Sequence, residues 1–302
     1  MHTTNTSLRR KQALAGLLLP VSIAMSLGVF VLARELGANP ATVILIVSVG
    51  TLLVAMAAER LVPHVRSWNR ADGDVGTDLS SALVLGGLID PALKYLAPVA
   101  AIALYACFDI SGVYEALFGQ MSFLWQVLVV TLFIELGRYW VHRAHHRIPS
   151  LWWLHAMHHS SRRLYALNTL RFHPLNYILN FAGGTFPFIL IGTPAEVLLA
   201  YLALTQPVLI LQHSNLGSRH SLLNYVFSTN EAHRWHHSAD AAVASCNYGS
   251  ALLIWDHVFC TFRYSADGKS PETVGLFAKD GHSYPSRAPY LSQIWSFFSR
   301  EC

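Results

Sequence analysis

The sequence predicts an all-helical integral membrane protein with about four transmembrane helices, a short hairpin that spans or re-enters the membrane, and a helical cap that carries histidine motifs. Composition supports this fold class, because 53% of the 302 residues are hydrophobic and only 13% are charged. Soluble domains usually contain about 25% charged residues. Long apolar stretches and a dense cluster of histidines are the two further observations behind the prediction.

Four apolar stretches are long enough to cross a bilayer, which takes about 20 residues. The third contains Asp90, Pro91 and Lys94, so it forms either a hairpin or one kinked helix. A single helix kinked at Pro91 keeps the basic clusters on one face of the membrane, whereas a hairpin separates them. We therefore predict spans at 13–33, 41–62, 79–107 and 123–141.

A further apolar stretch, 175–211, is interrupted by the turn residues Gly192, Thr193 and Pro194. Its two arms are short for full spans, so a spanning hairpin and a re-entrant hairpin both remain open. We divide the chain into N-terminal transmembrane helices with a linker (1–78), a membrane-embedded domain with the histidine motifs (79–263), and a polar, loop-rich C-terminal tail (264–302) in which we expect little chemistry.

The charged residues indicate a membrane surface and no nucleic-acid partner. The formal net charge is only +4, and basic residues such as Arg9, Arg10 and Arg162 stand beside apolar stretches. The four cysteines form no C-x-x-C pair, so neither a disulfide framework nor a cysteine zinc site is predicted. A reducing environment follows, with the cap on the cytosolic face of a multi-pass protein.

Histidines carry the predicted chemistry. Twelve of the sixteen lie between His142 and His237, and most of them form three tight groups. The first group ends the fourth span, and the second and third share the spacing H-x-x-H-H. Their histidines are His142, His145 and His146; His155, His158 and His159; and His233, His236 and His237.

The spacing predicts two metal ions. Side chains at i, i+3 and i+4 share one helical face, so each H-x-x-H-H is expected to aim three imidazoles at one place. Eight imidazoles, with His213 as a further candidate, are too many for one ion. Only Glu196 and Glu231 are acidic between His142 and His237, so imidazoles dominate the ligand set. Such ligands suit iron, copper, nickel and zinc alike, although the hydrolytic zinc motif H-E-x-x-H is missing.

Other histidines are expected to support the site or to lie outside it. His145 should point away from its neighbours and act behind the ligands. His173, which precedes Pro174, and His257, which follows Asp256, have either a supporting role or none. The remaining ones are interpreted as ordinary surface or core residues: His2, His64, His220 and His282.

The motifs together resemble the fatty acid hydroxylase and sterol desaturase superfamily over roughly residues 59–263. The resemblance is carried by Glu59-Arg60-x-x-Pro63, Thr77-Asp78, His142-Arg-x-x-His146, Leu151-Trp152-x-x-His155-x-x-His158-His159-Ser160, Arg171-x-His173-Pro174, His213-Ser214, Glu231-x-His233-Arg-x-His236-His237-Ser238, Asn247-Tyr-Gly and Trp255-Asp256. An arginine is common in relatives where this chain has His257.

The resemblance implies four membrane helices, a cytosolic catalytic cap, two iron ions, and O2 as co-substrate with electrons from a separate reductase. By motif it assigns the metal to His142, His146, His155, His158, His159, His233, His236 and His237, and to His213 as a further ligand. His145, His173, Asn247 and Asp256 become candidates for supporting or substrate contacts. Segment 79–263 is then a fatty acid hydroxylase-like catalytic domain.

We expect a membrane-bound di-iron oxygenase that hydroxylates a C–H bond of a lipid, in a bacterial inner membrane. Desaturation of a sterol-like or acyl lipid is the alternative, because both reactions begin with the same hydrogen abstraction. A zinc-binding scaffold and a metal transporter are remote alternatives; the spans hold few ionisable residues, among them Asp90, Lys94 and Glu135. The sequence has no haem-binding H-P-G-G element, so an external ferredoxin or cytochrome is the expected electron donor.

Overall fold

The structure is a computed structural model that describes residues 10–108, 110, 112–267, 269–276 and 284–299. Within these ranges the chain contains no β-strand, and its only extended pairings are three isolated bridges. The helices are α2 (Leu18–Glu35), α3 (Pro40–Leu61), η1 (Arg66–Asn69), α4 (Val75–Val84), η2 (Leu85–Ile89), α5 (Asp90–Tyr105), α6 (Val113–Phe118), α7 (Phe123–Arg147), α8 (Pro149–His159), η3 (Ala166–Leu170), α9 (Pro174–Gly183), α10 (Phe186–Leu190), α11 (Ala195–Leu211), η4 (Ser221–Tyr225), α12 (Asn230–His236), α13 (Ala241–Ala244), α14 (Ile254–Val258) and α15 (Tyr290–Ser299).

Four helical segments of the described chain are long and apolar enough to cross a membrane, which confirms the predicted all-helical membrane fold. They are Arg10–Glu35, Pro40–Leu61, Val75–Tyr105 and Phe123–Arg147. The fourth extends beyond the predicted end at residue 141, because the polar residues of the first histidine motif continue the helix without a break. The first histidines therefore lie on the last turns of a long, rigid helix.

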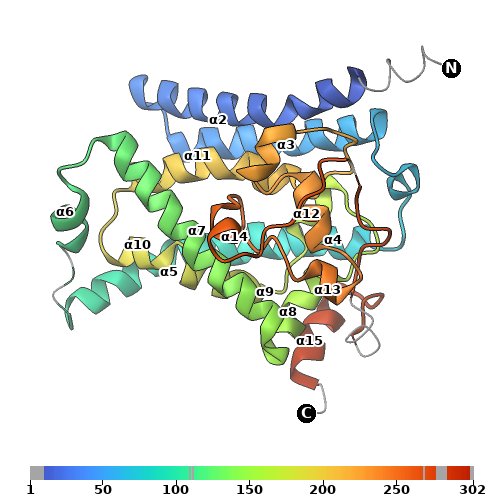
Figure 1. Cartoon of the computed structure of the whole chain (residues 1–302). Coiled ribbons are helices and arrows are strands. Elements are labelled where there is room, and N and C mark those ends of the chain that lie inside the picture. The colour runs from blue at the N-terminus through green and yellow to red at the C-terminus, as the bar shows by residue number, and fades with distance from the viewer. Residues whose placement is uncertain (1–9, 109, 111, 268, 277–283, 300–302) are drawn as a thin grey trace.

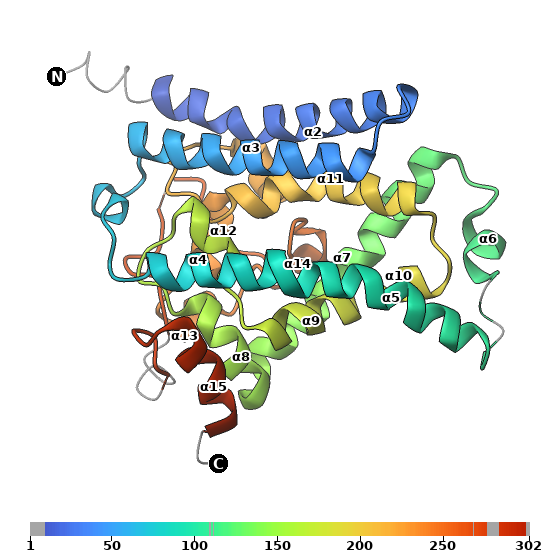
Figure 2. The same cartoon turned by 180° about the vertical axis from the view of Figure 1, so that it is seen from behind.

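The third span is one continuous helix, as predicted, and the local irregularity lies just before Pro91. Helices α4 and α5 run end to end in Figure 2 and are joined by η2, a short π-helical turn. The N–H of Asp90 bonds to the carbonyl of Leu85, five residues back. Pro91 has no N–H to continue the α-helical pattern, so a wider turn at this point keeps the helix continuous.

Helices α2, α3 and α11 lie side by side (Figures 1 and 2), and α7 packs against α11. Their buried contact is built from Phe30, Ile44, Val130 and Tyr201, among others. The outward faces of α2, α3 and α5 stay apolar, as shown by the exposed side chains of Leu45 and other residues. An apolar outer surface around an apolar core is what a lipid environment requires.

The predicted hairpin after residue 175 has two unequal arms. The first is broken into α9 and α10, and the second is the single helix α11. The break falls at Gly183 and Gly184, where α9 approaches α7 so closely that a Cβ on Gly137 would lie 2.0 Å from the carbonyl oxygen of Gly183. This close approach brings α9 against the end of α7 that carries the histidines.

The C-terminal segment differs from the loop-rich tail that the sequence predicted. Residues Tyr290–Ser299 form the amphipathic helix α15, which packs on α4 and α8. Gln293 on its buried face accepts from Tyr284 and donates to the carbonyl of Ala288, and Ser296 accepts a hydrogen bond from Trp153. Six of the ten residues of α15 are apolar and recur at helical intervals, but the polar Gly-, Ser- and Pro-rich sequence before them led the whole segment to be interpreted as a loop-rich tail.

Candidate metal centre

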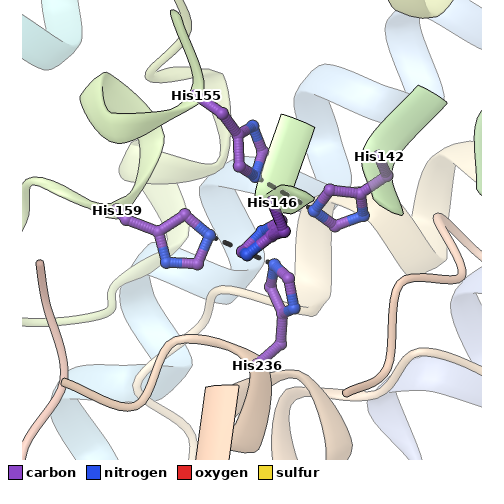
Figure 3. Close-up of side chains that lie close together, drawn as sticks. All are labelled: His142, His146, His155, His159 and His236. Atoms are coloured by element: carbon purple, nitrogen blue, oxygen red, sulfur yellow. Dashed lines mark hydrogen bonds between the residues drawn. The ribbon is translucent and has the colours of Figure 1, made fainter. Parts of the chain in front are cut away.

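Nine histidines meet between the ends of the helices in two groups. The five-histidine group consists of His142, His146, His155, His159 and His236, and the four-histidine group consists of His158, His213, His233 and His237. Within each group one ring nitrogen from every histidine lies within 4.8 Å of the corresponding nitrogen of every other. Figure 3 shows the rings of the five-histidine group pointing toward a common centre. The nine are the residues that the sequence analysis singled out.

Each H-x-x-H-H motif serves both groups, which corrects the prediction that it aims three imidazoles at one place. On α8, His155 and His159 enter the five-histidine group, whereas His158 enters the other. In the motif of α12 the pair at i and i+4, His233 and His237, enters the four-histidine group. His236, at i+3, enters the five-histidine group. Successive residues of a helix differ by about 100°, so i and i+4 point nearly the same way while i+3 diverges from i+4.

Backbone carbonyls fix the orientation of three rings. His142 donates from Nδ1 to the carbonyl oxygen of Tyr248 at 2.7 Å, and His236 donates from Nδ1 to that of Cys246 at 2.8 Å. In the other group, His158 donates from Nδ1 to the carbonyl of Arg171 at 3.1 Å. A carbonyl oxygen can only accept, so the proton of each neutral ring lies on Nδ1 and the Nε2 lone pair faces the group.

These lone pairs face other ring nitrogens at short range. His142 Nε2 lies 3.0 Å from His155 Nε2, and His236 Nε2 lies 3.1 Å from His159 Nε2. In the four-histidine group, Nε2 of His233 lies 3.0 Å from Nε2 of both His213 and His237. Imidazole nitrogens that bind one ion at about 2.1 Å and at right angles are about 3.0 Å apart. The spacing and the lone pairs therefore fit a cation within each group.

Burial keeps the rings in the neutral form that binds metal. His236 and His237 are at most 1% exposed. Burial, followed by the neighbouring imidazoles, lowers their pKa well below the ordinary histidine value. Burial likewise lowers the pKa of His158 to about 3. Neither group includes a carboxylate or a thiol. Each group therefore offers a cation only neutral nitrogen donors, which suit a transition metal and not calcium or magnesium.

A buried carboxylate holds the loop behind the five-histidine group. Asp256 accepts hydrogen bonds from the backbone N–H of Tyr248 at 2.8 Å and of Gly249 at 2.7 Å, and from the hydroxyl of Thr261. Burial raises the pKa of Asp256, against the opposing effect of these hydrogen bonds. The same loop presents the carbonyl that accepts from His142. Asp256 thus positions a ring without touching it.

Two buried ion pairs stand behind the four-histidine group. Asp78 pairs with Arg171, whose carbonyl oxygen accepts from His158. Asp74 pairs with Arg163 at 2.7 Å, and the carbonyl of Arg163 accepts from the side-chain amide of Asn168. The Oδ1 atom of Asn168 lies 2.8 Å from Nδ1 of His213. The ion pair Asp78–Arg171 therefore acts on His158 through the Arg171 carbonyl. The ion pair Asp74–Arg163 acts on His213 through the side-chain amide of Asn168.

The remaining predicted residues lie outside both groups. His145 is buried and donates from Nδ1 to the carbonyl of Val141. His173 caps α9 by accepting from the N–H of Leu175. Asn247 donates to the carbonyls of Ala232 and Arg263 at the base of α12.

His257 contacts the carbonyl of Tyr225 and stacks on Phe262 at the surface, away from the two groups. Of the histidines interpreted as ordinary, His64 and His220 both lie outside the groups, and His220 is buried against Asn230. His2 and His282 lie outside the described residues.

Several supporting residues escaped the sequence analysis. Asn168 and Asn176 each place Oδ1 2.8 Å from the Nδ1 of a ligand-group histidine, namely His213 and His155. Phe172 stacks on His158 with the ring centres 4.2 Å apart. Isolated asparagines and aromatic residues carry no spacing signal, and their positions beside the rings depend on how the loop 160–173 folds back over α8. Their proximity to the Arg-x-His-Pro element was the one available clue.

Comparison with known proteins identifies the family. The family model described as fatty acid hydroxylase matches residues 127–261. The ornithine lipid hydroxylase OlsE of Rhizobium tropici is 32% identical over 264 residues, which cover 85% of this chain and 76% of that protein. Alkylglycerol monooxygenases of Xenopus tropicalis and Homo sapiens are 27% and 26% identical, over 46% of this chain and 30% and 31% of their own lengths. No solved structure gives a significant match.

The matched region begins at the fifth residue of α7 and includes α8 and α12. It therefore contains every histidine of both groups. The relatives are hydroxylases and monooxygenases, in agreement with the chemistry that the histidine motifs predicted. The chain belongs to the fatty acid hydroxylase family, within the fatty acid hydroxylase and sterol desaturase superfamily, and is an oxygen-dependent lipid hydroxylase.

Proposed function

We propose that each histidine group binds one iron ion and that the two ions together use O2 to hydroxylate a carbon of a membrane lipid. The ligands are the nine histidines of the two groups: His142, His146, His155, His159 and His236 for one ion, and His158, His213, His233 and His237 for the other. The observation that carries the proposal is the set of Nε2 atoms that face one another at 3.0 to 3.1 Å. When bound, the irons supply the oxidising power toward an unactivated C–H bond.

The protein contributes position and the exclusion of water. The two groups share α8 and α12, so the distance between them is set by rigid helices and does not depend on mobile loops. Trp152, which is 7% exposed, covers the rings of His146 and His159 with centroid distances of 5.1 and 5.3 Å. A dry site of this kind limits side reactions of the oxidant with water and protons.

The substrate class is a polar membrane lipid. Ornithine lipid is the first candidate, because a relative that covers 85% of this chain is named an ornithine lipid hydroxylase. Electrons come from an external ferredoxin or cytochrome with its reductase, since the sequence has no haem-binding H-P-G-G element. His145, His173, Asn247 and Asp256 support the ligand-bearing segments and contact neither ion.

The histidine cap faces the cytosol, and a bacterial inner membrane is the proposed location. Exposed basic residues lie at the cap ends of the spans, among them Arg10, Lys11 and Arg162. At the opposite end, Arg34 is paired with Glu196 at 2.6 Å, which leaves that side with little free positive charge. An excess of basic residues marks the cytosolic side of membrane proteins.

Expression in a bacterial host that makes ornithine lipid tests the proposal. Lipid extracts from cells grown under heavy-isotope oxygen gas should contain a lipid enlarged by one labelled oxygen atom. The lipid should be missing when both His158 and His236 are replaced by alanine, because this change removes one ligand from each group. An unchanged lipid profile, from protein shown to be folded and iron-loaded, would contradict the proposal.

A further inference from the structure

A polar cavity of about 130 Å³ lies on the cap side of the molecule, separate from the facing ring nitrogens. Its walls come from the first turn of the N-terminal helix, the segments after α3 and α11, helix α12, and the residues Tyr264, Lys269 and Ser270. Three of its lining residues are basic and one is acidic: Arg219, Arg234, Lys269 and Glu231. The volume accommodates several waters or one small polyatomic anion.

Arg234 is the unusual residue of this cavity. It is 3% exposed, yet its one hydrogen bond among the described residues runs from Nη1 to the carbonyl of Leu216 at 3.3 Å. Its Nε atom is buried without a hydrogen-bond partner, and no carboxylate in the described chain lies within ion-pair distance. A guanidinium has five N–H donors, and a buried charge without a counter-charge is strongly unfavourable. The geometry calls for an anion in the cavity.

Glu231 lines the same cavity, and its charge opposes the lowering of the Arg234 pKa by burial, but among the described residues it forms no ion pair with the guanidinium. Its Oε2 atom accepts hydrogen bonds from the N–H of His220 at 2.6 Å and from the side-chain amide of Asn224 at 3.0 Å. The second basic wall residue, Arg219, is exposed on an otherwise buried loop and lines the same cavity as Arg234 of α12. Lys269 is already paired with Asp267 at 2.8 Å. Arg234 and Arg219 therefore carry the positive charge that is available to a ligand.

The cavity lies where a lipid headgroup would be found. Gln12, in the first turn of the span Arg10–Glu35, lines it, and so does His64, three residues after the end of the span Pro40–Leu61. Further along the first span, Leu14 and Leu17 are 67% and 53% exposed, which provides an apolar surface for acyl chains. A Cβ on Gly16 would lie 2.4 Å from the carbonyl oxygen of Arg219, so the glycine allows this loop to close against the span.

We propose that this cavity binds the oxyanion of a membrane lipid headgroup, a phosphate or a carboxylate, between Arg234 and Arg219. The guanidinium groups supply forked donors to the oxyanion, and the acyl chains follow the exposed apolar side of the first span. A free anion such as inorganic phosphate offers the same oxyanion but no acyl chains. A lipid should therefore bind more tightly than the free anion, because its chains also contact the apolar surface of the first span.

Binding of defined lipids to the purified, metal-loaded protein in an uncharged detergent tests this site. Native mass spectrometry would compare phosphatidylglycerol, which carries a phosphate, with a neutral diacylglycerol, and a thermal-shift titration would use inorganic phosphate alone. We expect phosphatidylglycerol to be retained and to raise the melting temperature, diacylglycerol to be lost, and inorganic phosphate to have a much smaller effect.

Two variants and a control locate the binding. Arg234→Gln and Arg219→Gln should each weaken phosphatidylglycerol binding roughly ten- to hundredfold, the scale of a lost charge-assisted hydrogen bond. Arg162→Gln removes an exposed arginine of the same side and should leave binding unchanged. Arg234 follows the ligand-group residue His233, so the metal content of each variant is measured as well. Arg234 is also buried, and if Arg234→Gln does not fold, Arg219→Gln alone still tests the site.

Equal retention in all four proteins would overturn the proposal. So would a thermal shift by inorganic phosphate as large as that by phosphatidylglycerol, because the ligand would then be a free anion. Loss of lipid oxidation with lipid retention intact would count against the metal chemistry alone, since retention is measured without turnover.

Discussion

The two histidine groups use the same kind of ring but are supported in different ways. The five-histidine group includes His142 and His146 at the end of a transmembrane helix, and the loop that Asp256 holds orients the ring of His142. The four-histidine group has no ring from a transmembrane helix, and the ion pair Asp78–Arg171 supports it. The difference teaches that one group is anchored by the end of a transmembrane helix and a lone buried carboxylate, and the other by buried ion pairs.

The comparison implies that each group binds its metal ion independently of the other. The strongest test of this is to remove two ligands from one group at a time. The double change His233→Ala with His237→Ala should remove the ion of the four-histidine group and leave the other, and His142→Ala with His146→Ala should do the reverse. Either loss should lower activity more than about a hundredfold, beyond the effect of losing a supporting residue. Elemental analysis and product formation measure both effects.

His257→Ala is the matched control, because this histidine lies at the surface outside both groups. Loss of both metals in each double variant would show that the groups form one cooperative unit and would contradict the comparison.

The role of buried charge is tested at Asp78. The change Asp78→Asn leaves the Arg171 guanidinium buried without its counter-charge, so the free energy of unfolding should fall by about 3–5 kcal/mol. Metal should be lost first from the four-histidine group, because the carbonyl of Arg171 orients His158. Chemical denaturation in detergent, with metal analysis at each step, follows both changes.

Asp267→Asn breaks an exposed ion pair with Lys269 and serves as the control, for which no measurable destabilisation is expected. If Asp78→Asn released metal from both groups at the same denaturant concentration, the ion pair would not be specific to one of them.

The loop behind the five-histidine group is tested at Asp256. In Asp256→Asn one carboxylate oxygen becomes an N–H2 group that cannot accept, so the side chain loses either the hydrogen bond from Gly249 to Oδ2 or those from Tyr248 and Thr261 to Oδ1. The affinity of the five-histidine group for metal should fall roughly 10- to 100-fold. Competition with a coloured chelator measures the affinity, and an unchanged affinity of the four-histidine group is the internal control. A larger loss in the four-histidine group would contradict the assignment.

The smallest effect is expected at the aromatic cover of the four-histidine group. Phe172 stacks on His158 with an angle of 11° between the rings, and Phe172→Leu keeps an apolar side chain without the stacked ring. Stability should fall by about 0.5–1.5 kcal/mol with both metals retained. Thermal unfolding with metal analysis tests this, and the loss of a metal would mean that the ring does more than pack.

Sequence reasoning found the spans and the nine clustered histidines because both depend on local spacing. An apolar stretch of about 20 residues has one dominant use, and H-x-x-H-H is a compact pattern. The division of each motif between two groups was missed, although i+3 diverges from i and i+4 on any helix, because the three positions were treated as one face. The contribution of Asn168 and Arg171 was also missed, because their contacts join segments that are distant in the sequence.

The most direct test of the two-group account is an anomalous difference map, at the iron absorption edge, from crystals of the iron-loaded protein. The account predicts two peaks, one among His142, His146, His155, His159 and His236, and the other among His158, His213, His233 and His237. A single peak, or a peak outside both groups in protein shown to contain iron, would contradict it.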